Sequence, residues 1–268
     1  MALRARPVSS RSRPALSDRD ARVGHVPSDD TLERMVEKQV DRVADLQKVF
    51  YADGRYALLV ILQGRDASGK DGVIKKVFRD VNPQGVHVTA FRAPSEAEQL
   101  HDYLWRVHER MPPRGMFGVF NRSHYEEVLV PRVHGLIDRA EWTRRFRQIN
   151  EFERMLAENR VVILKFFLHM SKKEQRTQLQ ERLEDPTKNW KFRESDLDDR
   201  KLWDEFTVAY RDLLVRCSTP WAPWYIIPAD DKHVRNLFVA RTIAERLAKL
   251  DLRYPRAPKR IRRLKITS

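Results

Sequence analysis

The stretch YALLVILQGRDASGKDG, residues 56–72, decides the fold of this chain. Residues 56–62 form a continuous apolar run of strand length, as expected of a strand that is buried on both faces. A helix is expected directly after the stretch, from about residue 70 to residue 79. The segment GRDASGKDG therefore joins a buried strand to a helix, and this is the setting in which a glycine-rich loop binds phosphate.

Gly64, Gly69 and Lys70 match the pattern G-x-x-x-x-G-K within this segment. In such a loop the backbone N–H groups and the N-terminus of the following helix cradle an anion. The lysine ammonium would reach the phosphoryl group that is transferred. The alternative is a glycine-containing turn with a surface lysine, which the flanking strand and helix disfavour. The predicted phosphate-binding residues of the loop are Gly64, Ala67, Ser68, Gly69, Lys70, Asp71 and Gly72.

Two acids stand inside this loop and set it apart from the usual pattern. Asp71 follows Lys70, where such a loop normally has a Ser or Thr that holds Mg²⁺. Near a helix N-terminus it would also be favoured by the helix dipole alone, so both interpretations stay open. Asp66 would repel phosphate unless a cation lay between them. It is therefore interpreted as a Mg²⁺ ligand or an acid–base group, with a turn-capping aspartate as the alternative.

Strand and helix patterns alternate along the rest of the chain. Strands are expected at residues 56–62, 86–91, 116–120, 161–168 and 224–227, and helices at 31–50, 70–79, 95–109, 141–157, 171–183, 201–215 and 232–250. Such alternation means βαβ units with right-handed crossovers and a mainly parallel sheet. The sequence therefore predicts an α/β fold around a five-stranded parallel sheet.

A second polar cluster, FNRSHYEEVL at residues 120–129, begins where the third predicted strand ends. Ligands of open α/β sheets bind beyond the carboxyl ends of the strands, so Asn121, Arg122 and Glu126 are expected beside the phosphate loop. Arg122 would bind phosphate through two N–H groups. Glu126 would hold Mg²⁺ or orient the acceptor. Each residue alone would be an ordinary polar group at a strand end, and His124 by itself is interpreted as structural.

A basic helix and loop, HMSKKEQRTQLQERLEDPTKNWKF, follows the fourth predicted strand. Lys172 and Arg176 are four residues apart and share a helix face. In kinases with a phosphate loop such a segment closes over the phosphates and excludes water. The alternative is a solvated charged helix. The predicted phosphate-binding residues of this segment are Lys172, Arg176, Arg182 and Lys191.

Together the three segments resemble the family-2 polyphosphate kinases. The similar runs are LQGRDASGKDG, VNPQGVHVTAFRAPSEAEQLHDYLWRVH, GVFNRSHYEEVLVPRVH and ILKFFLHMSKKEQ…RLEDPTKNWKF, between about residues 51 and 210. The resemblance implies a three-layer α/β P-loop kinase fold like that of thymidylate kinase, with a helical lid at about residues 171–203. It also implies Mg²⁺ as cofactor, with Mn²⁺ as a substitute, and polyphosphate as phosphoryl donor or acceptor.

The resemblance also assigns roles to single residues. Asp66 and Lys70 match the family's Walker A positions. Arg122 matches its Walker B arginine, and Arg176 matches an arginine of the lid. With Glu126, these are the expected catalytic residues.

Asn121 departs from the commoner pattern of the family, in which an Asp precedes Arg-Ser. The version NRSHYE resembles the subgroup that phosphorylates both AMP and ADP from polyphosphate. A neutral amide is a poor metal ligand, so Asp66 and Glu126 remain the predicted ligands of Mg²⁺. The expected reaction transfers phosphate from polyphosphate to AMP and ADP, giving ADP and ATP.

Composition and charge fit a polyanionic substrate. The 268 residues include 52 Lys and Arg against 38 Asp and Glu, a net charge of +14. Such a balance favours nucleic acid, nucleotide, polyphosphate or an acidic membrane as partner. Cys217 is the only cysteine, which fits a reducing compartment and predicts a small buried residue. No apolar run approaches membrane-span length, so the expected location is the cytoplasm.

The two ends of the chain are basic. Residues 1–30 are rich in Arg, Ser and Pro and are expected to form a disordered arm, although the composition faintly resembles an organelle transit peptide. Residues 31–252 are expected to form the phosphotransferase domain. Residues 253–268 are expected to form a basic tail that is solvated, contacts a polyanion or packs as an arm.

Two other functions remain as alternatives. An ATP-dependent nucleoside monophosphate kinase would share the fold, and a basic ATPase or binding module would act on nucleic acid. The sequence has no RNA-recognition motif and no helix-turn-helix signal. We therefore expect polyphosphate and adenine nucleotides as partners, with guanine nucleotides left open, and neither nucleic acid nor a membrane. A homo-oligomer, dimer or tetramer, is also expected.

Overall fold

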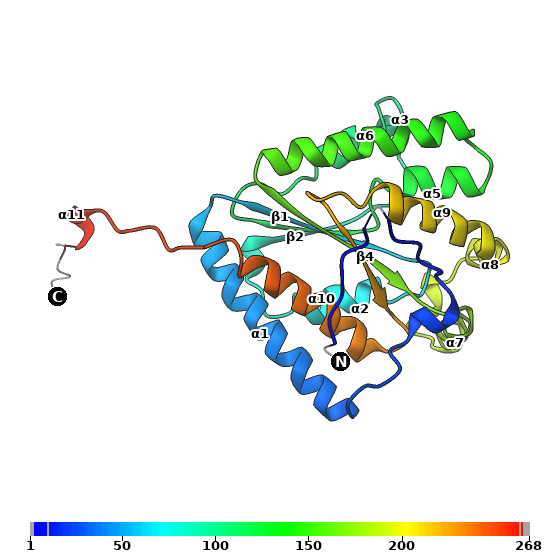
Figure 1. The fold of residues 1–268 in the computed structure, drawn as a ribbon, viewed down its shortest axis with the longest axis horizontal. Helices are drawn as coiled ribbons and strands as arrows, with labels where there is room; N and C mark the ends of the chain where they lie inside the picture. Colours follow the sequence, from blue (N-terminus) through cyan, green and yellow to red (C-terminus); the bar gives the residue numbers. More distant parts are fainter. Residues whose placement is uncertain (1–2, 10, 263, 265–268) are drawn as a thin grey trace.

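The computed structural model describes residues 3–9, 11–262 and 264, with the backbone alone for Lys191 and Arg262. Its five strands form one sheet in the order β2-β3-β1-β4-β5, with every neighbouring pair parallel (Figure 1). The strands are β1 (Ala57–Gln63), β2 (Val86–Ala90), β3 (Phe117–Asn121), β4 (Val161–His169) and β5 (Trp224–Pro228). The predicted five-stranded parallel sheet is confirmed.

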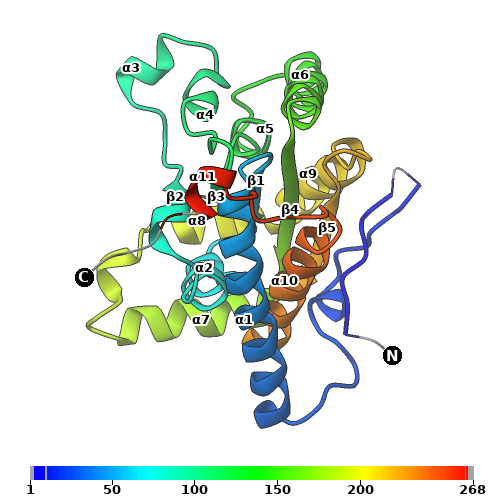
Figure 2. The ribbon, with the colours of Figure 1, turned by 90° about the vertical axis from the view of Figure 1, so that its left-hand side faces the viewer.

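Helices cover both faces of this sheet, as Figure 2 shows. The helices α1 (Asp29–Asp53), α2 (Lys70–Val77) and α10 (Lys232–Leu247) pack with Leu58, Val60 and Leu62 in one core cluster. The helices α5 (Glu126–Val133), α6 (Arg139–Glu158) and α9 (Trp203–Arg216) pack with Leu59 and Ile61 in the other. Successive side chains of a strand point to opposite faces, so β1, which is apolar from Ala57 to Leu62, supplies both cores. The three-layer α/β architecture is therefore confirmed.

The helix expected at residues 95–109 is interrupted. Ser95 and Glu98 form the predicted capping box at the start of α3, but α3 ends at Gln99. The Oδ1 atom of Asp102 then accepts a hydrogen bond from the backbone N–H of Leu104, 2.9 Å long. Such local bonding offers the backbone an alternative to the helix. The segment continues as a second short helix, α4 (Trp105–His108).

The remaining elements are short or belong to the lid. They are η1 (Asp18–Ala21), η2 (Pro83–Gly85), α7 (Lys172–Glu184), η3 (Asn189–Lys191), α8 (Ser195–Lys201) and α11 (Lys259–Arg262). The segment predicted as a lid, residues 171–203, contains α7, η3 and α8, and the name lid is kept below for these three elements. No helix among the described residues is long and apolar enough to cross a membrane.

The N-terminal arm, residues 3–9 and 11–28, lies against the body instead of being disordered (Figure 1). The backbone N–H of Val8 donates to the carbonyl of Trp224 at 2.8 Å, and Pro7 forms an antiparallel bridge with Tyr225. Four apolar residues of the arm, Ala5, Val8, Leu16 and Ala21, are buried. The apolar residues of this stretch are too sparse to show a period. Packing against β5 is therefore a tertiary property that composition alone did not indicate.

The described part of the C-terminal tail leaves the body after α10 (Figure 1). The backbone N–H of Arg253 donates to Asp53 at 2.8 Å, and the residues that follow extend outward and are exposed.

Candidate active site

The phosphate loop occupies the turn between β1 and α2. Ala67 and Gly69 both have left-handed backbone conformations, with φ of 65° and 87°. Such turns aim successive N–H groups toward one point and build an anion-binding concavity. Gly69 is also the residue just before the first turn of α2, so the helix N-terminus faces the same point.

The side chain of Lys70 packs against this loop. Its Nζ atom donates to the carbonyls of Gly64 at 2.9 Å and Arg65 at 3.1 Å, and the residue is only 8% exposed. Burial, together with the nearby charge of Arg122, lowers the pKa of Lys70 to about 8. Among the described residues, the hydrogen-bond partners of its ammonium are these two carbonyls and the hydroxyl of Ser68. These bonds are neutral, so a phosphate oxygen would compete for them.

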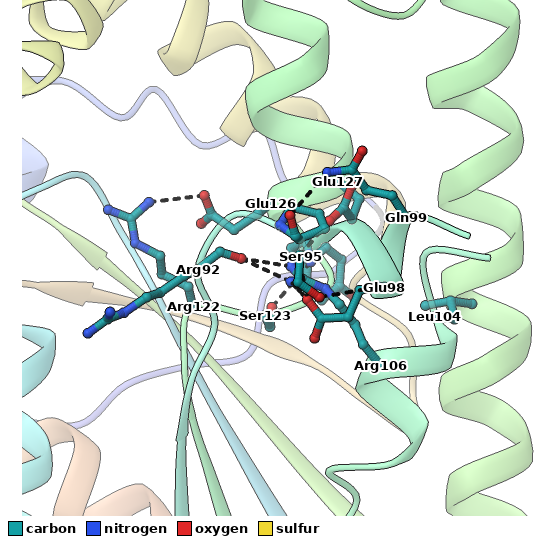
Figure 3. A network of polar contacts seen from close by, with 12 residues as sticks. Arg92, Ser95, Glu98, Gln99, Leu104, Arg106, Arg122, Ser123, Glu126 and Glu127 are labelled. Atoms are coloured by element: carbon teal, nitrogen blue, oxygen red, sulfur yellow. Dashed lines mark hydrogen bonds and ion pairs between the residues drawn. The ribbon is translucent and has the colours of Figure 1, made fainter. Parts of the chain in front are cut away.

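Arg122 lies between two carboxylates at the end of β3. Its guanidinium donates to Asp66 at 2.6 Å and to Glu126 at 3.1 Å, and Figure 3 shows the second of these bonds. Asn121 is paired in register with Leu62, and its amide donates to Asp71 at 2.7 Å. Because β1 and β3 are parallel neighbours, their carboxyl ends meet, and the structure brings together both predicted segments.

The charges of this cluster shift one another. Burial alone would raise the pKa of Asp66, but Arg122 and Lys70 hold it below its ordinary value. Glu126 raises the pKa of Arg122, with Asp66 adding to the effect. Both carboxylates therefore favour the charged form of Arg122, which lines the cleft beside the phosphate loop.

Asp66 and Glu126 offer carboxylate oxygens, the ligand type that Mg²⁺ prefers. They come from different elements and share one guanidinium between them, so they fit a hard cation in donor type. No group of three or more His, Cys, Asp or Glu able to hold a metal occurs within the residues that the structure describes. A metal here would therefore take the rest of its shell from water and substrate phosphates, as Mg²⁺ commonly does.

The lid reaches Asp66 through residues that the sequence did not single out. The amide of Gln175 on α7 donates to the carbonyl of Asp66 at 3.1 Å. Burial raises the pKa of Asp196 on α8, and the nearby Asp66 raises it further. Arg182 lies 3.7 Å from Asp196. Asp196 sits in the acid-rich run ESDLDD, where nothing distinguishes it from its neighbours.

The predicted basic residues of the lid are divided by the structure. Arg182 lines the cleft beside the phosphate loop, but Lys172 and Arg176 are exposed and lie outside its lining. Lys172 instead lies over the ring of Trp203, with Nζ 5.8 Å from its centroid. Lys172 and Arg176 do share a face of α7, yet it is not the face toward the loop. The side chain of Lys191 lies outside the described residues.

The phosphate loop opens into a cleft of about 1140 Å³ between α2, α7, the start of α10 and the N-terminal arm. Its basic lining includes residues that no motif indicated, since they come from distant parts of the chain. These are Arg22, Lys232 and Arg235; Lys188, from the basic segment predicted as a lid, lines the cleft as well.

A separate network of buried polar groups lies beneath the site. Lys165 Nζ bonds to Glu153 at 2.5 Å, the Tyr125 hydroxyl at 2.7 Å and the Cys217 carbonyl at 2.7 Å. His124 Nε2 lies 3.3 Å from Glu153. His124 is 1% exposed, as expected of a structural residue, and the predicted burial of Cys217 is confirmed.

A third group of contacts, drawn in Figure 3, ties the segment after β2 to α5. The guanidinium of Arg106 donates to the carbonyl of Arg92 at 3.0 Å and to Glu98 at 3.2 Å. It also reaches Glu127 at 3.4 Å. Arg106 thereby holds α3, α4 and the first turn of α5 in one arrangement beside Glu126.

The parallel sheet, the phosphate loop with its lysine, and an arginine at the next strand end define a P-loop phosphotransferase. The family profile described as "Polyphosphate kinase 2 (PPK2)" matches residues 26–255. The chain belongs to the polyphosphate kinase 2 family.

Individual relatives agree with this membership. The chain is 52% identical over 214 residues to an AMP/ADP-polyphosphate phosphotransferase of Meiothermus ruber, covering 80% of each protein. It is 45% identical to an ADP-polyphosphate phosphotransferase of Rhodopseudomonas palustris, covering 82% of this chain and 81% of that one. The crystal structure of Polyphosphate Kinase 2 from Arthrobacter aurescens TC1 is similar with a TM-score of 0.85 at 39% identity, covering 93% of this chain and 87% of that one.

Proposed function

We propose that this protein transfers phosphoryl groups from inorganic polyphosphate to AMP and ADP, giving ADP and ATP. The observation that carries the proposal is the joining of Lys70, Arg122 and the carboxylates of Asp66 and Glu126 at one end of the sheet. It is supported by the 52% identity to a protein named for AMP/ADP–polyphosphate transfer. The same fold would serve an ATP-dependent nucleoside monophosphate kinase, but none of the relatives described above carries such a name.

The chemistry needs positioning and charge compensation more than covalent participation by the protein. The loop amides hold one phosphate, Lys70 follows the transferred group, and Arg122 neutralises its oxygens from the other side. Mg²⁺, held by Asp66 and Glu126, would offset the negative charge of the phosphate oxygens. Mn²⁺ is proposed as a substitute.

The donor is recognised by charge. Polyphosphate carries about one negative charge per phosphate, and the cleft offers Arg182, Lys188, Lys232 and Arg235 besides the loop. Contacts between exposed charges are screened by salt. The KM for polyphosphate is therefore expected to rise with ionic strength.

The test is a phosphotransfer assay with long-chain polyphosphate, Mg²⁺ and AMP, and with no ATP present. ADP and then ATP are expected to accumulate. Nucleotide phosphorylation only when ATP is added would instead identify a nucleoside monophosphate kinase. Conversion of ADP without any consumption of AMP would leave the polyphosphate reaction standing and contradict the dual acceptor.

The acceptor range depends on Asn121 in this proposal. AMP and ADP present different terminal phosphates, so the acceptor shifts by one phosphate between the two reactions. A neutral amide repels either position less than a carboxylate does. The Asn121→Asp variant should therefore change the preference between AMP and ADP more than the total turnover, whereas Glu126→Gln should slow both reactions.

The proposal also covers the acceptor base, the oligomeric state and the cellular location. We propose adenine nucleotides as the main acceptors, a homo-oligomer of two or four copies, and a cytoplasmic location, the last because the lone cysteine suits a reducing compartment. Competition between AMP and GMP, and the mass of the protein by light scattering, test the first two.

A further inference from the structure

Arg235, in the first turn of α10, presses its guanidinium against the backbone of the phosphate loop. A Cβ atom built on Gly69 would lie 2.3 Å from its Nη1 atom, and one built on Gly72 would lie 3.3 Å from Nη2. Glycine is favoured at position 69 by its left-handed φ, and the guanidinium occupies the space beside it. Arg235 faces the loop from the α10 side and lines the same cleft as Arg122.

The surroundings of Arg235 lack a partner for its charge. Its one hydrogen bond is a long contact to the carbonyl of Ala229, 3.4 Å, and its buried Nε atom has no partner in the described structure. No carboxylate of the described residues forms an ion pair with it. Burial lowers the pKa of Arg235 to about 10, although Asp231 and Glu174 act in the opposite direction. It remains a cation at neutral pH, held against a loop built to bind anions.

Arg122 shows the contrast. That residue bonds to two carboxylates, whereas Arg235, which also lies beside the loop, bonds to none within the described part of the chain. Placing a charge in a half-buried position without a counter-ion is unfavourable. An anion bound at the loop would supply Arg235 with a partner for its charge, and this would explain why the guanidinium is placed there.

Resting on the proposed function, we propose that Arg235 binds a non-reacting phosphate of the polyphosphate chain. The chain then leaves the transfer site between α7 and α10, where Lys188 and Lys232 line the cleft. Acids line it as well, among them Glu174, Glu181 and Asp231, so Arg235 has to hold the chain where they would repel it. A guanidinium can do this through two parallel bonds to one phosphate.

The test compares Arg235→Met with Arg246→Met, a matched loss of charge on the same helix at an exposed position outside the cleft. For Arg235→Met, the KM for long-chain polyphosphate is expected to rise about tenfold, the effect of one lost contact of about 1.4 kcal/mol. Inorganic tripolyphosphate has only two phosphates besides the transferred one and makes fewer contacts along the cleft, so its KM should rise less. The kcat and the KM for AMP should stay near those of the unchanged protein, as should every constant of Arg246→Met.

Other outcomes overturn the inference. An equal fall in kcat with every donor and acceptor would show that Arg235 only supports the loop, and the thermal midpoint would then fall too. A rise in the KM for AMP alone would assign the phosphate to the nucleotide. Arg235→Lys guards against misfolding, because a retained charge should recover part of the affinity.

Calorimetric binding of polyphosphate to both variants separates this inference from the proposed function. If the unchanged protein transfers no phosphate from polyphosphate, the proposed function fails. Weaker binding by Arg235→Met than by Arg246→Met would still support the contact, and equal binding would refute it.

Discussion

Two clusters of charged residues lie close together in this molecule and differ in how they are satisfied. Beneath the sheet end, Lys165 directs its ammonium to a carboxylate, a hydroxyl and a carbonyl, with its side chain wholly buried. At the phosphate loop, Lys70 bonds to neutral oxygens of its own loop and, within the part of the chain that the structure describes, to no carboxylate. The Lys165 cluster is called closed here, because its charge is already paired and its bonds stabilise the structure. The Lys70 cluster is called open, because its ammonium is available to a substrate.

The closed cluster also supports the open one. Tyr125 belongs to the first and directly precedes Glu126, the carboxylate that holds Arg122. The buried hydroxyl of Ser123 accepts a hydrogen bond from the backbone N–H of Tyr125 and so holds the start of this segment in place. Substitutions in the closed cluster should therefore reduce stability, and substitutions in the open cluster should reduce activity.

The largest effect is expected from Lys165→Met. It leaves Glu153 buried without its cation, which typically costs about 3–5 kcal/mol of the free energy of unfolding. Urea denaturation measures this loss, with Lys172→Met as an exposed control that should change stability by less than about 0.5 kcal/mol. The double replacement Lys165→Met with Glu153→Gln should recover part of the loss. A single variant as stable as the unchanged protein would show that the network contributes nothing.

Lys70→Ala should have the opposite signature. We expect kcat with polyphosphate to fall at least a hundredfold, about 2.7 kcal/mol of barrier, because the transferred group loses its mobile cation. The free energy of unfolding should hardly change, since the ammonium bonds only to the loop itself. Steady-state kinetics and urea denaturation on one preparation check both halves. Turnover above about a tenth of the original would contradict the role of this lysine, since tenfold is only about 1.4 kcal/mol.

The pH dependence of kcat/KM for polyphosphate should report the open cluster alone. The pKa of Lys70 is lowered to about 8 by burial, so the lysine is charged below that pH and neutral above it. Phosphate needs the charged form, so kcat/KM should fall as pH rises through 8, by up to tenfold per pH unit. Lys70→Arg keeps its charge and should give a slower but flatter profile. A level profile of the unchanged protein from pH 7 to 9.5 would disprove this assignment.

The smallest effect is expected from the lid. Arg176 is exposed and outside the cleft in this structure, so Arg176→Ala should raise the KM for polyphosphate only about twofold at low salt, as exposed charges do. Added salt should mimic part of the loss. Arg182→Ala, which removes a cleft residue, should have the greater effect. Kinetics of Arg176→Ala identical to the original at low salt would mark Arg176 as a solvated helix residue.

Much of the fold and the centre of the site followed from sequence because they rest on local pattern. The apolar β1 and the glycine-rich loop after it fix a strand, a turn and a helix. The parallel sheet then brings Arg122 to the same edge. Asp66, Lys70 and Glu126 were found in this way.

What could not be predicted depends on long-range packing. The lid helix α7 is polar apart from Leu179 and Leu183, so spacing alone could not show that Lys172 and Arg176 face away from the loop. Asp196 and Arg235 come to the site from other segments, and the sequence around each of them does not predict this position. The interruption after α3 coincides with one local hydrogen bond, from the backbone N–H of Leu104 to the side chain of Asp102, which helical periodicity does not predict.

The packing of the N-terminal arm against β5 has a consequence for self-association. An uncovered strand at the border of a sheet offers its N–H and C=O groups to any extended chain, including another copy. Here Val8 occupies part of that border, and Pro7, which has no N–H to donate, cannot extend the pairing outward. Proteolytic loss of the arm would open this border to a second molecule. Its first visible sign would be turbid, aggregating protein, before any change in the rate of phosphate transfer.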